Sequence, residues 1–183
     1  MYGMVNKAVQ QLICKDYGED TWQRIRAKAG VDVEVFMSNE SYPDEVTYRL
    51  VAAASEELNL PAADILRAFG EHWVLHTALD GYGGLMRAGG NSLPEFLENL
   101  PNFHTRVAMI FPKLEPPRFA CSDVTPHSLH LHYHTHRPGL EPFVEGLLTG
   151  LGKMFNVPVR VELLESRGCG ADHDVFALSW HAA

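Results

Sequence analysis

Ser128-Leu129-His130-Leu131-His132-Tyr133-His134-Thr135-His136-Arg137 is the stretch that determines the fold, because two kinds of side chain alternate along it without a break. Side chains two positions apart on a β-strand project to the same face. A strand over residues 128–137 therefore carries four histidines on one face and leucine, tyrosine, threonine and arginine side chains on the other. Two such different faces are typical of an antiparallel sheet that covers a core on one side.

One face of this predicted strand ends in three hydrogen-bond donors, Tyr133, Thr135 and Arg137. At roughly 3.3 Å per residue the row spans about 13 Å. A phenol, a hydroxyl and a guanidinium in a row suit an anionic ligand, above all a carboxylate, which an arginine can bind with two hydrogen bonds. The row predicts a binding site for carboxylate groups.

The other face carries His130, His132, His134 and His136, part of a cluster from His127 to His136. Alternating imidazoles on a strand are either a solvated face or the ligands of zinc, nickel or copper. Because they lie in a line, a tetrahedral site would need a ligand from a second element. The sequence Asp172-His173-Asp174 is a similar case and is interpreted as a polar hairpin turn rather than as a ligand set.

The rest of the chain predicts an α+β fold, in which a helical N-terminal half precedes an antiparallel sheet with helices packed on it. Apolar residues recur at helical spacing through most of residues 5–111, with glycines at Gly81, Gly83 and Gly84 that we expect to interrupt the helices. Further strands are predicted at Phe119–Val124, Val157–Leu164 and Val175–Trp180, the last two as a hairpin, and a helix at Pro142–Phe155.

Composition narrows the functional classes. The 183 residues are 46% apolar and suit a single domain with its own core. The net charge of −8 argues against a nucleic-acid partner, and no apolar run is long enough to span a membrane. Three scattered cysteines and the absence of a signal peptide predict a cytoplasmic protein. Motifs of hydrolases, nucleotide-binding proteins and zinc proteases are missing, so we expect no enzyme.

His104 is the histidine that stands on an apolar helical stripe, with Leu100, Val107 and Phe111 at positions −4, +3 and +7. An imidazole in such surroundings needs partners for its nitrogens. One interpretation is a core histidine bonded to a carbonyl oxygen. The other is an axial ligand of a flat apolar cofactor such as haem, which is often held by a single proximal histidine.

Taken in order along the chain, these features resemble the H-NOX domains, the haem nitric oxide/oxygen-binding family related to the sensor domain of soluble guanylate cyclase. The resemblance extends over essentially the whole chain and implies a bacterial stand-alone member. It rests on Met1-Tyr2-Gly3-Met4-Val5-Asn6, Ala68-Phe69-Gly70-Glu71-His72-Trp73, Ser92-Leu93-Pro94-Glu95-Phe96, His104, Pro116-Pro117, and Tyr133-x-Thr135-x-Arg137 followed by Gly139-Leu140.

The resemblance implies a single haem-binding domain over residues 1–183, with a distal subdomain of about 1–65, a proximal subdomain of about 66–183, and haem b buried between the two halves. By resemblance, His104 is the axial iron ligand and Gly70 is a helix hinge. The propionates would be held by Tyr133, Thr135 and Arg137, where Thr135 replaces the family's serine and keeps the hydroxyl. The implied proximal wall is Leu100, Phe103, Pro117 and Phe119, and the implied distal wall is Val5, Trp73 and Phe143.

The function implied is a gas sensor that binds NO and CO at ferrous haem. Oxygen-binding members carry a distal tyrosine, whereas this chain has Phe143, or by another alignment Pro142, at that position. We therefore expect poor O2 binding. The signal would arise from a change in the bond between His104 and iron, and would pass to a partner protein such as a histidine kinase, a cyclic-di-GMP enzyme or a chemotaxis protein.

Two other classes remain at this stage. The first is a metal-binding module that uses the His127 to His136 cluster without haem. The second is a haem enzyme, which needs polar acid–base groups above the iron. Val5, Trp73 and Phe143 do not supply such groups.

Overall fold

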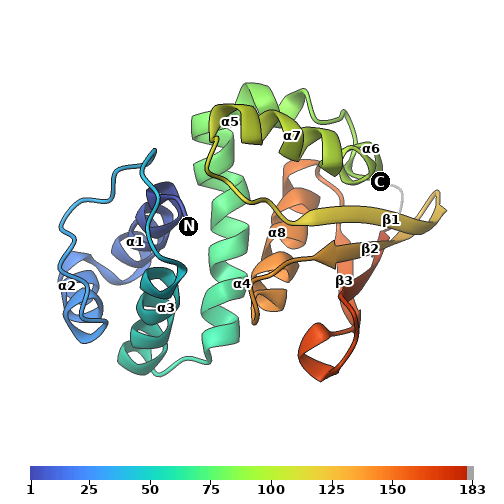
Figure 1. The fold of residues 1–183 in the computed structure, drawn as a ribbon. Coiled ribbons are helices and arrows are strands. Elements are labelled where there is room, and N and C mark those ends of the chain that lie inside the picture. Colours follow the sequence, from blue (N-terminus) through green and yellow to red (C-terminus); the bar gives the residue numbers. More distant parts are fainter. Residues whose placement is uncertain (181–183) are drawn as a thin grey trace.

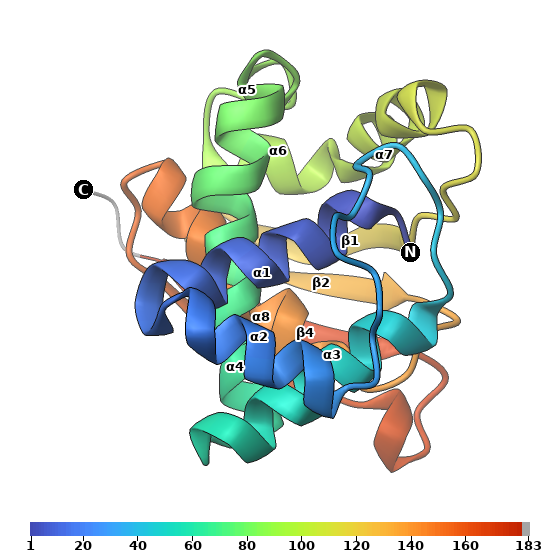
Figure 2. The same ribbon diagram turned by 90° about the vertical axis from the view of Figure 1, so that its left-hand side faces the viewer.

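The structure is a computed structural model, and it describes residues 1–180. Helices α1 (Gly3–Tyr17), α2 (Glu19–Lys28) and α3 (Asp44–Leu58) form the N-terminal group (Figures 1 and 2). A long helical column over residues 62–87 then separates that group from the sheet. The remaining elements are α6 (Leu93–Glu98), α7 (Leu100–Ile110), β1 (Arg118–Thr125), β2 (Ser128–His134), α8 (Glu141–Met154), β3 (Val159–Glu165), η2 (Arg167–Cys169) and β4 (Asp174–Trp180).

The sheet confirms the α+β prediction. Its four strands lie in the order β1-β2-β4-β3, and every neighbouring pair is antiparallel. The expected hairpin of β3 and β4 is present. The inner face of β2 is buried at Leu129, Leu131 and Tyr133, as the alternation predicts.

The prediction of a strand as far as Arg137 is wrong, because β2 ends at His134. The hydroxyl of Thr135 accepts a hydrogen bond from the backbone N–H of Arg137. A side chain thus takes the place of a strand partner, and Gly139 turns the chain with φ +71°. Thr135 and Arg137 consequently stand in the turn after the strand rather than in a straight row with Tyr133.

The long column contains α4 (Ala62–His72), a π-helical segment η1 (Trp73–Ala78) and α5 (Leu79–Arg87) (Figure 1). The expected interruption near Gly81, Gly83 and Gly84 is present as a kink, because Tyr82, between the first two glycines, leaves helical geometry at φ −138° within α5. A glycine costs a helix about 1 kcal/mol relative to alanine. The glycines thus weaken the helix at the place where the kink lies, and helical residues resume as far as Arg87.

Two apolar cores lie on either side of this column. The first packs α1, α2 and α3 against α4. The second packs α6 and α8 against the inner face of the sheet. Trp73 touches both cores, so the column is shared by the two halves of the molecule.

Helices α4 and α8 approach each other backbone to backbone. A Cβ atom at Gly70 would overlap the carbonyl oxygen of Phe143, and one at Gly146 would overlap the carbonyl oxygen of Arg67. The two glycines therefore permit the close contact, and Gly146 is a position that the sequence patterns did not reveal.

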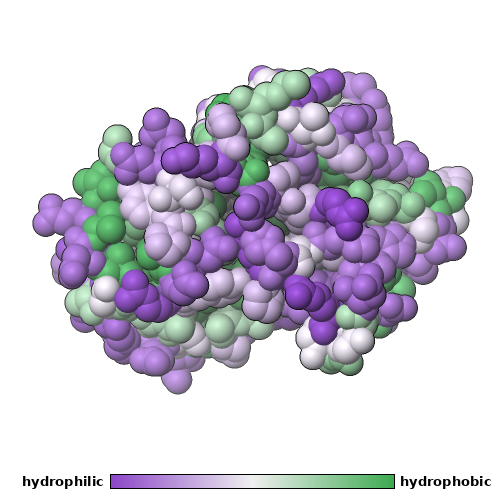
Figure 3. All heavy atoms as spheres, viewed as in Figure 1, coloured by the Kyte–Doolittle hydropathy of each residue, from purple (hydrophilic) through white to green (hydrophobic). Residues whose placement is uncertain are grey.

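The surface in the view of Figure 3 is predominantly hydrophilic, with apolar residues scattered at its edges. Among residues 1–180, no helix combines the length and the hydropathy that crossing a bilayer requires.

Candidate functional site

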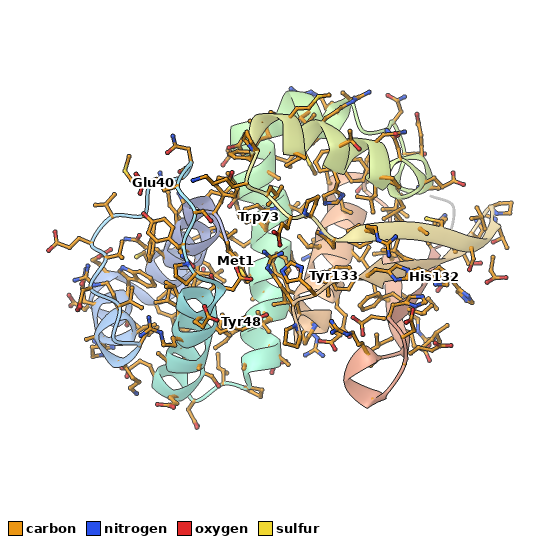
Figure 4. All side chains as sticks on the ribbon, viewed as in Figure 1. Met1, Glu40, Tyr48, Trp73, His132 and Tyr133 are labelled. Atoms are coloured by element: carbon orange, nitrogen blue, oxygen red, sulfur yellow. The ribbon has the colours of Figure 1, made fainter. Side chains whose placement is uncertain are left out.

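A cavity of about 300 Å³ lies between the N-terminal helices, the long column, α7 and the inner face of the sheet. This volume is at the lower end of the range for small-molecule and cofactor sites. Figure 4 shows Met1, Trp73 and Tyr133 gathered in this region from three different parts of the chain. Nearly all of the predicted pocket residues line the cavity: Val5, Trp73, Leu100, Phe103, His104, Pro117, Phe119, Tyr133, Thr135, Arg137 and Phe143.

Gly70 is the predicted site residue that does not line the cavity. It lies behind the wall, at the contact of α4 with α8. In the structure Gly70 allows the close contact of α4 with α8. Its role as a hinge stays a prediction.

His104 lies on α7 with its ring half-buried against the cavity. Its Nδ1 is 3.0 Å from the carbonyl oxygen of Leu100, one turn earlier. A carbonyl accepts only from an N–H, so this contact places the proton on Nδ1 and leaves the lone pair on Nε2. Burial lowers the pKa of His104, although the Leu100 bond opposes that shift. The ring is therefore neutral near pH 7, as a metal ligand must be.

The rings of His104, Phe119 and Tyr133 stack in a row across α7, β1 and β2. His104 on α7 stacks on Phe119 of β1 with ring centroids 5.4 Å apart, and Phe119 stacks on Tyr133 of β2 at 5.2 Å. The edge of Phe103 meets His104 at 5.6 Å. This packing fixes the plane of the imidazole on the side of the cavity that the sheet and α7 form.

The donor groups converge on the cavity from β2 and the turn after it. Burial is the main cause that raises the pKa of Tyr133, to about 12, so its phenol stays protonated and can donate. The Arg137 guanidinium donates from Nε to Asp44 Oδ2 at 2.7 Å and from Nη1 to the Glu115 carbonyl at 3.1 Å. The arginine is thus held at the rim by one carboxylate and one carbonyl.

Asp44 is a site residue that sequence reasoning missed. It lies in the first turn of α3 and also pairs with the amino group of Met1. Asp44 and Arg137 are 93 positions apart. No local pattern marks Asp44 beyond an acidic residue after Pro43 at a helix start, which is common for electrostatic reasons alone.

The distal wall is mainly apolar. Phe69 packs on Phe143 with centroids 4.8 Å apart and meets Trp73 edge-on at 6.1 Å. Two tyrosines that the sequence analysis did not place here, Tyr2 and Tyr82, also line the cavity. The hydroxyl of Tyr2 accepts a bond from the backbone N–H of Lys113 at 2.9 Å.

These residues fit a flat apolar cofactor that carries carboxylate groups. The walls are apolar, a neutral imidazole presents a free Nε2 lone pair, and a phenol and a guanidinium stand where carboxylates could be bound. An apolar pocket with a single histidine ligand is a common way to hold haem.

Comparison with known proteins agrees with the geometry. The family model described as Haem-NO-binding matches residues 2–163. Two soluble guanylate cyclases of Caenorhabditis elegans, gcy-37 and gcy-31, are 31% and 27% identical over 90% of this chain. A third, 89Db of Drosophila melanogaster, is 25% identical over 93% of the chain. The chain spans about a quarter of the length of these relatives, between 24% and 26%.

Solved structures share the fold. An H-NOX protein from S. oneidensis in its Fe(II)NO state superposes with a TM-score of 0.89 at 19% identity, covering 100% of both chains. The unliganded Fe(II) H-NOX protein from K. algicida gives 0.86 at 23% identity, covering 100% of this chain and 98% of that one. The family match, the fold and the donor set lead to one conclusion: the chain belongs to the Haem-NO-binding (H-NOX) family of gas-sensing domains, which bind haem.

Proposed function

We propose that this protein is a haem-based sensor that binds NO and CO at ferrous haem b and holds O2 poorly. The observation that carries the proposal is the open Nε2 of His104, a neutral imidazole whose other nitrogen is fixed by the Leu100 carbonyl. In the proposal His104 is the residue that would hold the iron. Ferrous haem would supply there the metal that binds the gas.

The propionates are assigned to Tyr133, Thr135 and Arg137. The protonated phenol of Tyr133 and the guanidinium of Arg137 are donors at the edge of the cavity. Arg137 already holds the carboxylate of Asp44, so it has the reach and the geometry for such a group. Thr135 keeps the turn in shape through its bond to the Arg137 N–H and offers its hydroxyl proton.

The proximal wall is assigned to Leu100, Phe103, Pro117 and Phe119. Phe103 and Phe119 hold the His104 ring from the edge and from the face. These contacts keep the ring in one orientation, so a change at its Nε2 is transmitted to helix α7. Pro117 lies in the segment between α7 and β1, where it would press on the face of the cofactor.

The choice of gas follows from the distal wall of Val5, Trp73 and Phe143. Bound O2 carries partial negative charge and gains from a hydrogen-bond donor, whereas NO binds without one. The Phe143 ring packs on Phe69 and has no hydroxyl to offer. We therefore infer stable NO and CO complexes and a short-lived O2 complex.

The signal is proposed to depend on the bond that His104 would make to the iron. Loss of that bond would release α7 and would let the distal half (about 1–65) shift against the proximal half (about 66–183). Because α4 and α8 touch backbone to backbone at Gly70, we propose that this contact is the pivot. The ligand favours one state because one bond exists in that state only.

We further propose that the chain is not an enzyme and acts in the cytoplasm on a separate signalling protein, such as a histidine kinase or a cyclic-di-GMP enzyme. Support comes from the relatives named as guanylate cyclases, in which the matched segment is about a quarter of the chain. A sensing segment attached to a larger protein passes its state to the rest of that protein.

The test is the absorption spectrum of the haem-loaded ferrous protein. We expect the Soret band to shift on addition of NO and of CO, and air to oxidise the iron without a lasting oxy spectrum. A stable oxy complex would overturn the assignment of gases. Purified protein that takes up no haem would overturn the function as a whole.

A further inference from the structure

A second group of ligand-type side chains lies on the outer face of the sheet, away from the haem cavity. His132 and His134 stand on β2, and His173 precedes β4. Strands β2 and β4 pair with Tyr133 opposite Asp174, which brings His173 back over β2. The His173 ring stacks on His134 with centroids 4.0 Å apart and lies 5.1 Å from the ring of His132. Figure 4 shows His132 farther out along β2 than the cavity residue Tyr133.

Two imidazole nitrogens face each other in this group. His132 Nδ1 is 2.8 Å from His173 Nε2. The remote nitrogens are both held by oxygen atoms, His132 Nε2 by Ser122 Oγ at 2.9 Å and His173 Nδ1 by Asp172 Oδ2 at 3.2 Å. These bonds fix the orientation of both rings, as partners of metal-binding histidines do.

His134 and Asp172 complete the cluster. Ligand atoms of His134, Asp172 and His173 all lie within 4.8 Å of one another. The three imidazoles are half-buried, and only 21% of the His173 side chain is exposed, so the rings are not a freely solvated face. Imidazoles with one carboxylate are the donor set of zinc, nickel and copper, whereas calcium and magnesium prefer oxygen ligands throughout.

We propose that His134, His173 and Asp172 bind one divalent transition-metal ion, with Zn²⁺ as the representative ion, while His132, itself bonded to Ser122, orients the His173 ring. The site is separate from the haem. In this proposal His173 and Asp172, which lie in the turn before β4, are the ligands from a second element that the strand histidines need.

The protons balance without a net release. In the metal-free protein, His132 Nδ1–H donates to His173 Nε2, and His173 Nδ1–H donates to Asp172. Metal binding through His173 Nδ1, the nitrogen beside Asp172, needs its proton to move to Nε2, where His132 Nδ1 accepts it. The His132 proton moves in turn to Nε2, where Ser122 Oγ accepts it while its own hydroxyl donates to Asp123.

The ion would tie the segment before β4 to the strand that lines the haem cavity. Arg167, in the same segment, already donates to the Thr135 carbonyl at 2.6 Å. Tyr133 and Thr135 belong to the strand and turn held in this way. Metal binding would therefore hold the propionate side of the cavity in place.

The experiment is a calorimetric titration of the haem-loaded protein with Zn²⁺ after treatment with a chelator, followed by X-ray absorption at the zinc edge. We expect one zinc per chain with imidazole and carboxylate ligands. His173→Ala should abolish this binding, and His134→Asn should weaken it. Asp172→Asn removes the anionic ligand and should weaken binding by at least about 10-fold, the loss that even an outer partner of a ligand causes. An unchanged Soret band confirms that each variant is folded.

The matched control is His130→Ala, because His130 lies on the same face of β2 but pairs with Asp123 at 2.9 Å instead of joining the cluster. This variant should bind zinc like the wild type. Equal losses in His130→Ala and His173→Ala would show adsorption to a histidine-rich surface and would overturn the proposal. A wild-type protein that binds no zinc would overturn it as well, with the gas-sensing function unaffected.

Discussion

His104 shows how one side chain can satisfy two requirements that the sequence presented as alternatives. It is a histidine bonded to a backbone carbonyl, and it still presents a free nitrogen to the cavity. The carbonyl bond fixes the tautomer that a metal ligand needs. The two interpretations of an imidazole on an apolar stripe are therefore compatible.

Replacing the His104 side chain separates cofactor binding from signalling. His104→Gly, purified with imidazole in the buffer, should keep haem through the free imidazole but leave α7 detached from it. Backbone amides of α7 should then exchange hydrogen faster than in the unliganded wild type, and as fast as in the wild type with NO. The control is Thr105→Gly, which puts the same glycine one position further along α7, costs about 1 kcal/mol of helix propensity and keeps the ligand. Slow exchange in His104→Gly with imidazole would contradict the proposed signal.

Phe143 tests the assignment of the distal wall. Phe143→Tyr adds one hydroxyl to a half-buried ring that lines the cavity. A hydrogen bond to a charged group contributes about 1.5 kcal/mol or more, so O2 dissociation should slow by about 10-fold or more, while NO binding changes little. Stopped-flow measurement of the O2 dissociation rate tests this expectation, with Phe143→Leu as the apolar control. If Phe143→Tyr and Phe143→Leu release O2 equally fast, Phe143 does not lie where the bound gas does.

Individual site residues differ in how far the sequence could reveal them. Tyr133 follows from strand alternation, and His104 from an apolar helical stripe, because both patterns are local. Asp44 could not be found in this way, since only the folded chain brings it to Arg137. The partnership of His173 with His132 is missed for the same reason, because it depends on the pairing of β2 with β4.

Among the helices and strands, those with a strong residue pattern were predicted well, whereas a strand end set by one side chain was not. The β3–β4 hairpin and the α8 helix follow from residue patterns. The kink of α5 at Tyr82 also follows, because the glycines around it favour a break. Strand β2 ends early because the Thr135 hydroxyl accepts a hydrogen bond from the chain after the strand, and the alternation of residue types does not indicate such a bond.

The contact of α4 with α8 gives a prediction about stability. Gly70→Ala would push a Cβ into backbone atoms of α8, which cannot rotate away, so the helices must separate. We expect a loss of about 1–3 kcal/mol, seen as a fall in Tm of about 2–4 °C for each kcal/mol. Gly84→Ala is the matched control, because Gly84 is exposed in α5 and a Cβ there meets nothing within 4 Å. That variant should gain about 0.5–1 kcal/mol. A Gly70→Ala protein as stable as the wild type would show that the contact is loose.

The two halves of the molecule meet around the cavity, and a pair of charged side chains connects them at its rim. Asp44 begins α3 in the N-terminal half, while Arg137 follows β2 in the other half. The amino group of Met1 joins the same carboxylate. The predicted division near residue 65 is thus bridged by an ionic contact at the place where the propionates are proposed to bind.

Asp44→Asn is expected to destabilise the whole molecule with a characteristic pH dependence. Burial alone would raise the pKa of Asp44, but hydrogen bonds from the Met1 amino group and from Arg137 outweigh it and lower the pKa below the ordinary 3.8. The ionic contact is therefore complete above pH 3.8 and is lost as the pH falls through the lowered pKa.

Urea unfolding of the haem-loaded protein should show Asp44→Asn to be less stable by about 1 kcal/mol, because both side chains are partly exposed, 27% and 16%. This difference should be constant from about pH 7 to about pH 5 and shrink below about pH 4, where the wild type also loses the charge. Glu45→Gln, at the exposed neighbouring position of α3, should change stability much less at any pH. A deficit for Asp44→Asn that persists unchanged in acid would mean that packing of the side chain, rather than its charge, joins the two halves.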